Sequence, residues 1–177
     1  MGMGELTSLR PLLAAMRGKK LLVVGDLYLD CYIFGLPARV SREAPIMVLE
    51  ETRREERPGG GTAPALVARA LGAAAWQAGV IGDDAEGQRL RRMLADQGVD
   101  VSGVLTDPTR PTTTKTRLVA EGAYNVFPQQ VARVDRQDRR PIDPAIAQSL
   151  AAFVEVTAPD VDAILLSERL VREDVYT

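Results

Sequence analysis

The chain has 177 residues, of which 46% are hydrophobic and 26% charged, with a formal net charge of −2. This fits one domain of ordinary size with a real hydrophobic core. The charge balance gives no general attraction to nucleic acid, and no apolar run reaches the roughly 18 residues that a membrane-spanning helix needs. Residues 1–20 lack the apolar block of a signal peptide, so we expect a cytoplasmic protein.

Histidine is absent, and cysteine occurs once, as Cys31. Histidine-based zinc sites and an internal disulfide are therefore excluded, and we expect no metal site. Because the usual near-neutral acid–base side chain is missing, any catalysis would depend on carboxylates, lysine, backbone dipoles or a bound cofactor.

Apolar periodicity and short β-branched runs predict the secondary structure. In chain order we expect a helix over 6–17, a strand over 21–24, two strands of a small separate sheet over 32–34 and 46–50, a helix over 65–71, a strand over 76–81, a helix over 85–97, strands over 101–105, 114–120 and 131–134, a helix over 143–156 and a strand over 163–166. This alternation indicates an α/β fold with a mostly parallel sheet. Ligands of such sheets bind beyond the carboxyl ends of the strands.

Three consecutive glycines, Gly59 to Gly61, precede a helix for which Thr62 is the expected N-cap. Backbone without Cβ atoms can approach a small ligand closely, and the helix N-terminus directs N–H groups to the same place. A phosphate, a sugar or a plain tight turn would each fit. The dinucleotide fingerprint and the Walker A pattern are both absent.

Two aspartates, Asp26 and Asp30, follow the first predicted strand and are four residues apart. Carboxylates at the end of a strand can accept hydrogen bonds from sugar hydroxyls. The alternative for Asp26 is that it only caps the turn.

Basic side chains alternate along two later strands. Lys115 and Arg117 share one face of a predicted strand, and Arg133 and Asp135 share a face of another. Cations on one face could bind an anionic group of a substrate, and an ordinary exposed strand face is the alternative.

An ordered set of segments lies between residues 20 and 135. They are Val23-Val-Gly-Asp-Leu-Tyr-Leu-Asp30, Tyr32-Ile-Phe-Gly35, Arg39-Val-Ser-Arg-Glu-Ala-Pro45, Glu56-Arg-Pro-Gly-Gly60, Leu71-Gly-Ala73, Gly82-Asp-Asp84 and Thr114-Lys-Thr-Arg117. In order and spacing the set resembles the ribokinase/PfkB family of carbohydrate kinases, and within it the heptose-phosphate kinases of the ADP-heptose pathway. The set is more specific for the superfamily than for the substrate.

The resemblance implies a ribokinase-like three-layer α/β/α fold, with 1–177 as a single partial domain and 32–50 as a β-lid. It matches Asp30 to the aspartate that binds sugar hydroxyls and the pair Gly59 and Gly60 to the diglycine that lies against the sugar. Lys115 and Arg133 match basic residues on the substrate side. The family's lid covers the sugar and often forms a dimer contact, so we expect a homo-oligomer or a companion chain.

The chain also departs from the family pattern. The asparagine expected early in the helix after the diglycine is replaced, with Ala63 and Val67 at the candidate positions, and Ser167-Glu-Arg-Leu-Val-Arg172 keeps only the serine and an acid of the usual Ser-Asp-Tyr-x-Lys-Gly. The glycine-rich G-A-G-D turn, which carries the family's catalytic base and an anion hole for the phosphoryl group, is absent. We therefore expect a chain truncated before the nucleotide-binding half, with ATP and magnesium implied by the family but bound elsewhere and no catalytic residue present.

The first hypothesis is thus the sugar-binding half of an ATP-dependent carbohydrate kinase acting on a sugar or sugar phosphate, with heptose phosphate favoured and no catalysis by this chain alone. The alternative is a degenerate or split module for sugar binding or dimerisation. A nicotinamide-binding Rossmann domain fits the fold class but lacks the fingerprint. A sheet cut partway would expose a strand edge and an apolar surface, so association is expected.

Overall fold

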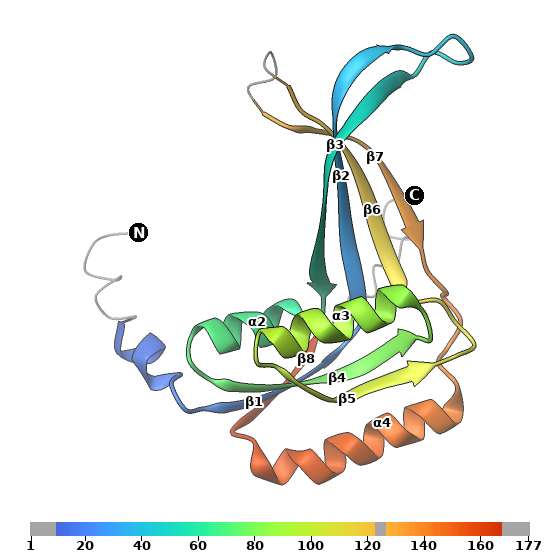
Figure 1. Cartoon of the computed structure of the whole chain (residues 1–177). Coiled ribbons are helices and arrows are strands. Elements are labelled where there is room, and N and C mark those ends of the chain that lie inside the picture. Colours follow the sequence, from blue (N-terminus) through green and yellow to red (C-terminus); the bar gives the residue numbers. More distant parts are fainter. Residues whose placement is uncertain (1–9, 123–126, 168–177) are drawn as a thin grey trace, which may run out of the picture.

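The computed structural model describes residues 10–122 and 127–167 (Figure 1). After a short helix over 10–15, its elements are β1 (Lys20–Gly25), β2 (Leu27–Val40), β3 (Met47–Gly60), α2 (Ala63–Ala70), β4 (Ala74–Gly82), α3 (Ala85–Asp96), β5 (Asp100–Asp107), β6 (Thr113–Ala120), β7 (Gln129–Arg136), α4 (Pro144–Thr157), a 3-10 turn η1 (Ala158–Asp160) and β8 (Ala163–Ser167). The strands form two separate four-stranded sheets.

The central sheet has the order β5-β4-β1-β8, and all its neighbouring strands are parallel. Helices α2 and α3 cover one face and α4 covers the other (Figure 1). The predicted three-layer α/β architecture is therefore confirmed. None of the helices in the described part of the chain is long and apolar enough to cross a membrane.

The core lies between the central sheet and helices α2 and α3. Leu90 and Leu94, four residues apart on α3, are fully buried, and α2 contributes only small buried side chains, Ala65 and Ala68. Small residues let α2 lie close to the sheet, whereas the leucine pair forms the apolar stripe of an amphipathic helix. Burial of each leucine contributes about 1.5–3 kcal/mol relative to exposure.

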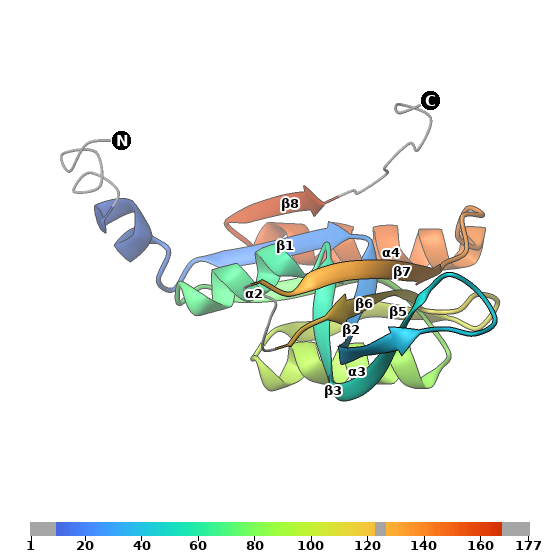
Figure 2. The ribbon, with the colours of Figure 1, turned by 90° about the horizontal axis from the view of Figure 1, so that it is seen from above.

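The second sheet, which we call the lid sheet, has the order β3-β2-β6-β7. Strands β2 and β6 are parallel, and the pairs β2–β3 and β6–β7 are antiparallel. The sheet rises from one end of the central sheet (Figures 1 and 2). Its strands β2 and β3 are longer than the predicted strands over 32–34 and 46–50, and only Asp26 separates β1 from β2.

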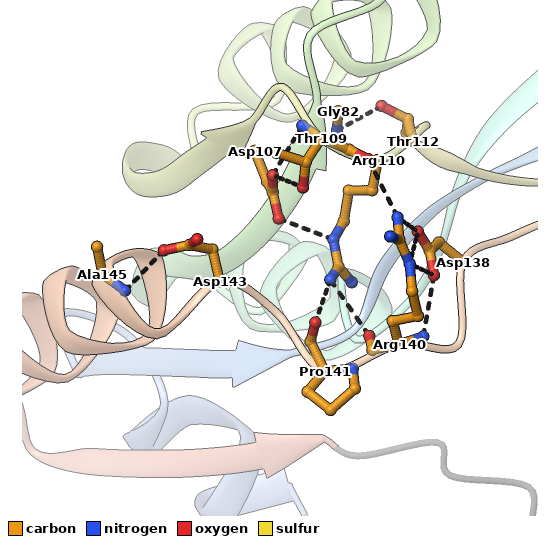
Figure 3. A network of polar contacts seen from close by, with 10 residues as sticks. All are labelled: Gly82, Asp107, Thr109, Arg110, Thr112, Asp138, Arg140, Pro141, Asp143 and Ala145. Carbon is orange, nitrogen blue, oxygen red and sulfur yellow. Dashed lines mark hydrogen bonds and ion pairs between the residues drawn. The ribbon is translucent and has the colours of Figure 1, made fainter.

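Two of the connections between the sheets, β5 to β6 and β7 to α4, are linked to each other by an arginine (Figure 3). Arg110 follows β5, and its Nε donates to Asp107 Oδ2 at 2.8 Å. Its Nη2 donates to the carbonyl of Pro141, 2.6 Å away in the segment between β7 and α4. Hydrogen bonds, first from Thr109 and also from Arg110, hold the pKa of Asp107 below its usual value. The two crossings are therefore fixed to each other.

Candidate functional site

The face of the lid sheet that carries the predicted site is set by the alternation of β2. Tyr28 and Asp30 point to one side of the strand, and the fully buried Leu29 points to the other. In the strand register, Gly59 of β3 lies opposite Tyr28 of β2. Lys115 of β6 lies opposite Asp30 of β2. Sheet pairing thus gathers residues that are far apart in the sequence at the base of the lid.

The glycine run is not a loop before a helix, because Gly59 and Gly60 are the last two residues of β3. A Cβ at Gly59 would overlap Asp30 Oδ2 and would lie 2.6 Å from a ring carbon of Tyr28. Gly60 has a φ of +64°, and a Cβ there would lie 2.7 Å from the carbonyl oxygen of Asp26. The side chains of β2 themselves therefore require these glycines, which leave room for the Asp30 carboxylate and the Tyr28 ring.

Thr62 stands at the predicted N-cap of α2, but its side chain makes no capping hydrogen bond. Its Oγ1 instead donates to the Gly59 carbonyl at 3.0 Å. The Gly61 N–H donates to the Asp26 carbonyl at 2.8 Å. These bonds close the turn after β3 and tie it to the end of β1.

Asp30 has a cationic partner that sequence reasoning did not identify. Arg117 Nη1 donates to Asp30 Oδ1 at 2.6 Å, and the two side chains are only 18% and 17% exposed. Burial acts to lower the pKa of Arg117, but the hydrogen bond and the charge of Asp30 outweigh it, so the pKa is raised. The alternation of Arg117 was visible in the sequence, whereas the register that brings it to β2 was not.

The two basic residues matched to the family lie in different electrostatic surroundings. Lys115 Nζ lies 4.4 Å from the centre of the Tyr28 ring, and none of the ion pairs between described residues includes it. Arg133, one strand further out, makes a two-pronged ion pair with Asp135 at 2.8 and 3.0 Å. The structure therefore places Lys115 beside Asp30 with its charge available, while Arg133 already has a carboxylate partner.

The two candidate positions for the family's asparagine, Ala63 and Val67, lie on the exposed side of α2. Val67 is 58% exposed, and Ala63, one turn earlier, is exposed as well. Neither side chain can make the hydrogen bonds of an amide. Ser167 ends β8 beside Gly25, and residues 168–172 of the later motif lie outside the described residues.

A hollow of about 490 Å³ lies between the lid sheet and α3, on the face of the sheet opposite to Asp30. Its charged groups pair with each other: Arg89 on α3 contacts Glu56 on β3 at 3.0 Å and Glu86 at 2.8 Å. Arg136 on β7 contacts Glu86 at 3.4 Å, and burial raises the pKa of Cys31 in the same hollow. These pairs link the lid sheet to α3.

The sequence matches the model of the pfkB family carbohydrate kinases over residues 19–168. It is 39% identical over 166 residues to the bifunctional protein HldE of Geobacter metallireducens, and the alignment covers 94% of this chain and 33% of that protein. HldE of Helicobacter pylori strain G27 is 39% identical over 150 residues, covering 85% and 31%. The chain spans about a third of the length of these curated relatives.

Solved structures show the same fold. A putative sugar kinase from Clostridium perfringens has a TM-score of 0.60 at 15% identity, covering 77% of this chain and 41% of that one. A putative ribokinase from Agrobacterium tumefaciens has a TM-score of 0.56 at 20% identity, covering 84% and 44%. At these identities the likeness establishes the fold alone.

Proposed function

Since this chain belongs to the pfkB family of carbohydrate kinases, we propose that it forms the sugar-binding half of an ATP-dependent kinase. The complete kinase would transfer a phosphoryl group to a hydroxyl of a sugar or sugar phosphate. The motif resemblance favours a heptose phosphate. The chain alone is not expected to catalyse this transfer, because no residue in it matches the family's catalytic base.

The observation that carries the proposal is the meeting of Asp30, the diglycine and Lys115 at the base of the lid. The carboxylate can accept hydrogen bonds from sugar hydroxyls, and Gly59 and Gly60 leave room for it and for the Tyr28 ring at the base of the lid. The ammonium of Lys115 supplies a positive charge for the phosphate of a sugar phosphate. We assign the substrate-binding role to these residues and, as a weaker contributor, to Arg133.

ATP and magnesium belong to the proposal through the family. When bound, ATP supplies the phosphoryl group and magnesium neutralises its developing charge. Within residues 10–122 and 127–167, no group of three or more His, Cys, Asp or Glu side chains is arranged to hold a metal ion. Because the family's G-A-G-D turn is absent from this sequence, the proposal assigns ATP and magnesium to residues outside this chain.

Calorimetry with heptose 7-phosphate and with unphosphorylated heptose tests the sugar site. Asp30→Asn should weaken both ligands by about tenfold or more, because a hydrogen bond to a charged group is lost. Lys115→Met should weaken only the phosphorylated sugar, and Arg133→Met should do so to a smaller extent. Arg54→Met, on the opposite face of the lid sheet, is the matched control. Unchanged binding by Asp30→Asn would overturn the proposed site.

The alternative, a non-catalytic module that binds sugar or dimerises, is favoured by one observation. Apolar side chains at the far end of the lid are exposed, among them Val40 at 67%, Ile46 at 61% and Met47 at 51%. Such a surface suits a second copy of the chain or a companion chain. Sedimentation equilibrium should show association that Ile46→Lys abolishes, and a monomer at micromolar concentration would contradict this alternative.

A single domain over 1–177 and a cytoplasmic location remain proposals.

A further inference from the structure

The hydrogen bond between Arg117 and Asp30 joins two adjacent strands of the lid sheet. It uses Asp30 Oδ1, at 2.6 Å from Arg117 Nη1. The other carboxylate oxygen, Oδ2, lies against the backbone of Gly59, where even a Cβ would overlap it. The two oxygens of this carboxylate therefore have different surroundings, one bound to a guanidinium and one against Gly59 beside the Tyr28 ring.

The guanidinium of Arg117 is itself held in place. Its central carbon lies 5.1 Å from the centre of the Tyr32 ring, and Arg57 lies at the same distance from that ring. Arg117 belongs to β6 and Arg57 to β3, so the two arginines flank β2 from opposite sides. A planar guanidinium stacked on a ring loses little freedom when it binds a carboxylate, which makes this pair a fixed support.

We propose that Arg117 is a positioning residue, which binds Asp30 through Oδ1 and so keeps Oδ2 free to accept a hydrogen bond from a sugar hydroxyl at the base of the lid. This inference rests on the proposed function, because it takes Asp30 as the group that binds the sugar. Arg117 does not contact the sugar or its phosphate in this proposal. Its contribution passes through Asp30, in contrast to Lys115, whose contribution depends on the phosphate.

A mutant cycle tests the inference, with Arg117→Met, Asp30→Asn and the double variant titrated against heptose 7-phosphate and unphosphorylated heptose. Arg117→Met should weaken both ligands by the same factor, about tenfold. In the Asp30→Asn background it should add no further loss. Arg117→Lys should retain more affinity than Arg117→Met, because lysine keeps the positive charge but lacks the planar guanidinium. A loss confined to the phosphorylated sugar, or equal losses with and without Asp30, would overturn the inference.

A ligand-free measurement separates this inference from the proposed function. In nitrogen-15 spectra of the whole chain, the side-chain N–H signals of Arg117 should be resolved and slow to exchange. They should lose that protection in Asp30→Asn but keep it in Glu51→Gln, a carboxylate on the same sheet. If the wild-type chain binds neither sugar while this signature is present, the proposed function fails and the pairing stands. If the signature is absent in folded wild-type protein, the positioning role fails whatever the sugar binding.

Discussion

The central sheet and the lid sheet each have four strands, but they differ in the burial and charge of their side chains. The two inner strands of the central sheet, β1 and β4, are largely apolar, and residues such as Leu22, Val23 and Ile81 are at most 1% exposed. The lid sheet has two long strands, β2 and β3, of which β3 carries many charged residues, and all of β7 is exposed. Stability therefore resides mainly in the central sheet, whereas the lid base holds the groups that can recognise a ligand.

The largest loss of stability should come from the core between the central sheet and α3. Leu90→Ala removes a fully buried side chain of α3 and should reduce the free energy of unfolding by about 2–5 kcal/mol. Val134→Ala, at a 61% exposed position of β7, is the control from the lid sheet. Urea unfolding measures both, and comparable losses in the two variants would refute the contrast between the sheets.

A smaller effect is expected at the junction of the two sheets. Gly60→Ala places a Cβ against Tyr28 and the Asp26 carbonyl at a φ of +64°, and should cost about 1–3 kcal/mol. Gly18 has a similar φ of +74° but nothing within 4 Å, so Gly18→Ala carries only the backbone strain. Thermal unfolding should therefore rank Gly60→Ala as the more destabilised variant. The reverse order would show that the close approach at Gly60 relaxes without cost.

An acid-dependent effect is expected at Asp84, the N-cap of α3. Burial acts to raise its pKa, but hydrogen bonds from Thr112 and Gly87 outweigh this and hold the pKa below its usual value. With the folded-state pKa lowered, the stabilisation is complete above the unfolded-state pKa of about 4 and is lost as the pH falls through the folded-state pKa. Asp84→Asn should lose about 1–2 kcal/mol at pH 7 and converge on the wild type in acid. The exposed Asp83→Asn is the control, and parallel pH curves for Asp84→Asn and the wild type would contradict the linkage.

The smallest effect should come from the exposed surface of the lid. Arg54 Nη2 donates to Glu51 at 2.8 Å, and both side chains are well exposed to solvent. Exposed pairs of this kind contribute little because water and salt screen them. Glu51→Gln should leave the urea midpoint unchanged within error at 150 mM salt, roughly the physiological value. A clear destabilisation would show that the lid depends on its charge pairs more than its exposure suggests.

The sequence was most informative about the central sheet and about the family. The apolar runs over 21–24, 76–81 and 163–166 correspond to β1, β4 and β8. Strands in the middle of a covered parallel sheet, as β1 and β4 are, need continuous apolar residues. The expectation that 163–166 is buried is wrong, because β8 is an edge strand whose apolar side chains are exposed. The PfkB resemblance is confirmed by the family match over residues 19–168. Local pattern was sufficient in both cases.

The lid was less predictable because its strands depend on register. β3 runs through residues 51–57, all charged except Thr52, which have no apolar alternation to mark a strand. It is held by pairing with β2. The ion pair between Arg117 and Asp30 likewise depends on β2 lying parallel to β6, a contact between residues 87 positions apart. The assignment of substrate-binding roles to Asp30, Gly59, Gly60, Lys115 and Arg133 stays a prediction.

The single residue between β1 and β2 has a mechanical consequence. A strand of 14 residues such as β2 extends up to about 45 Å, and Asp26 lies directly before its first residue. A rotation of roughly 10° about Asp26 would sweep the far end of the lid through about 8 Å, while Asp30, four residues from the pivot, would move only about 2 Å. Any rotation of the lid about Asp26 would therefore displace its rim several times further than the carboxylate at its base.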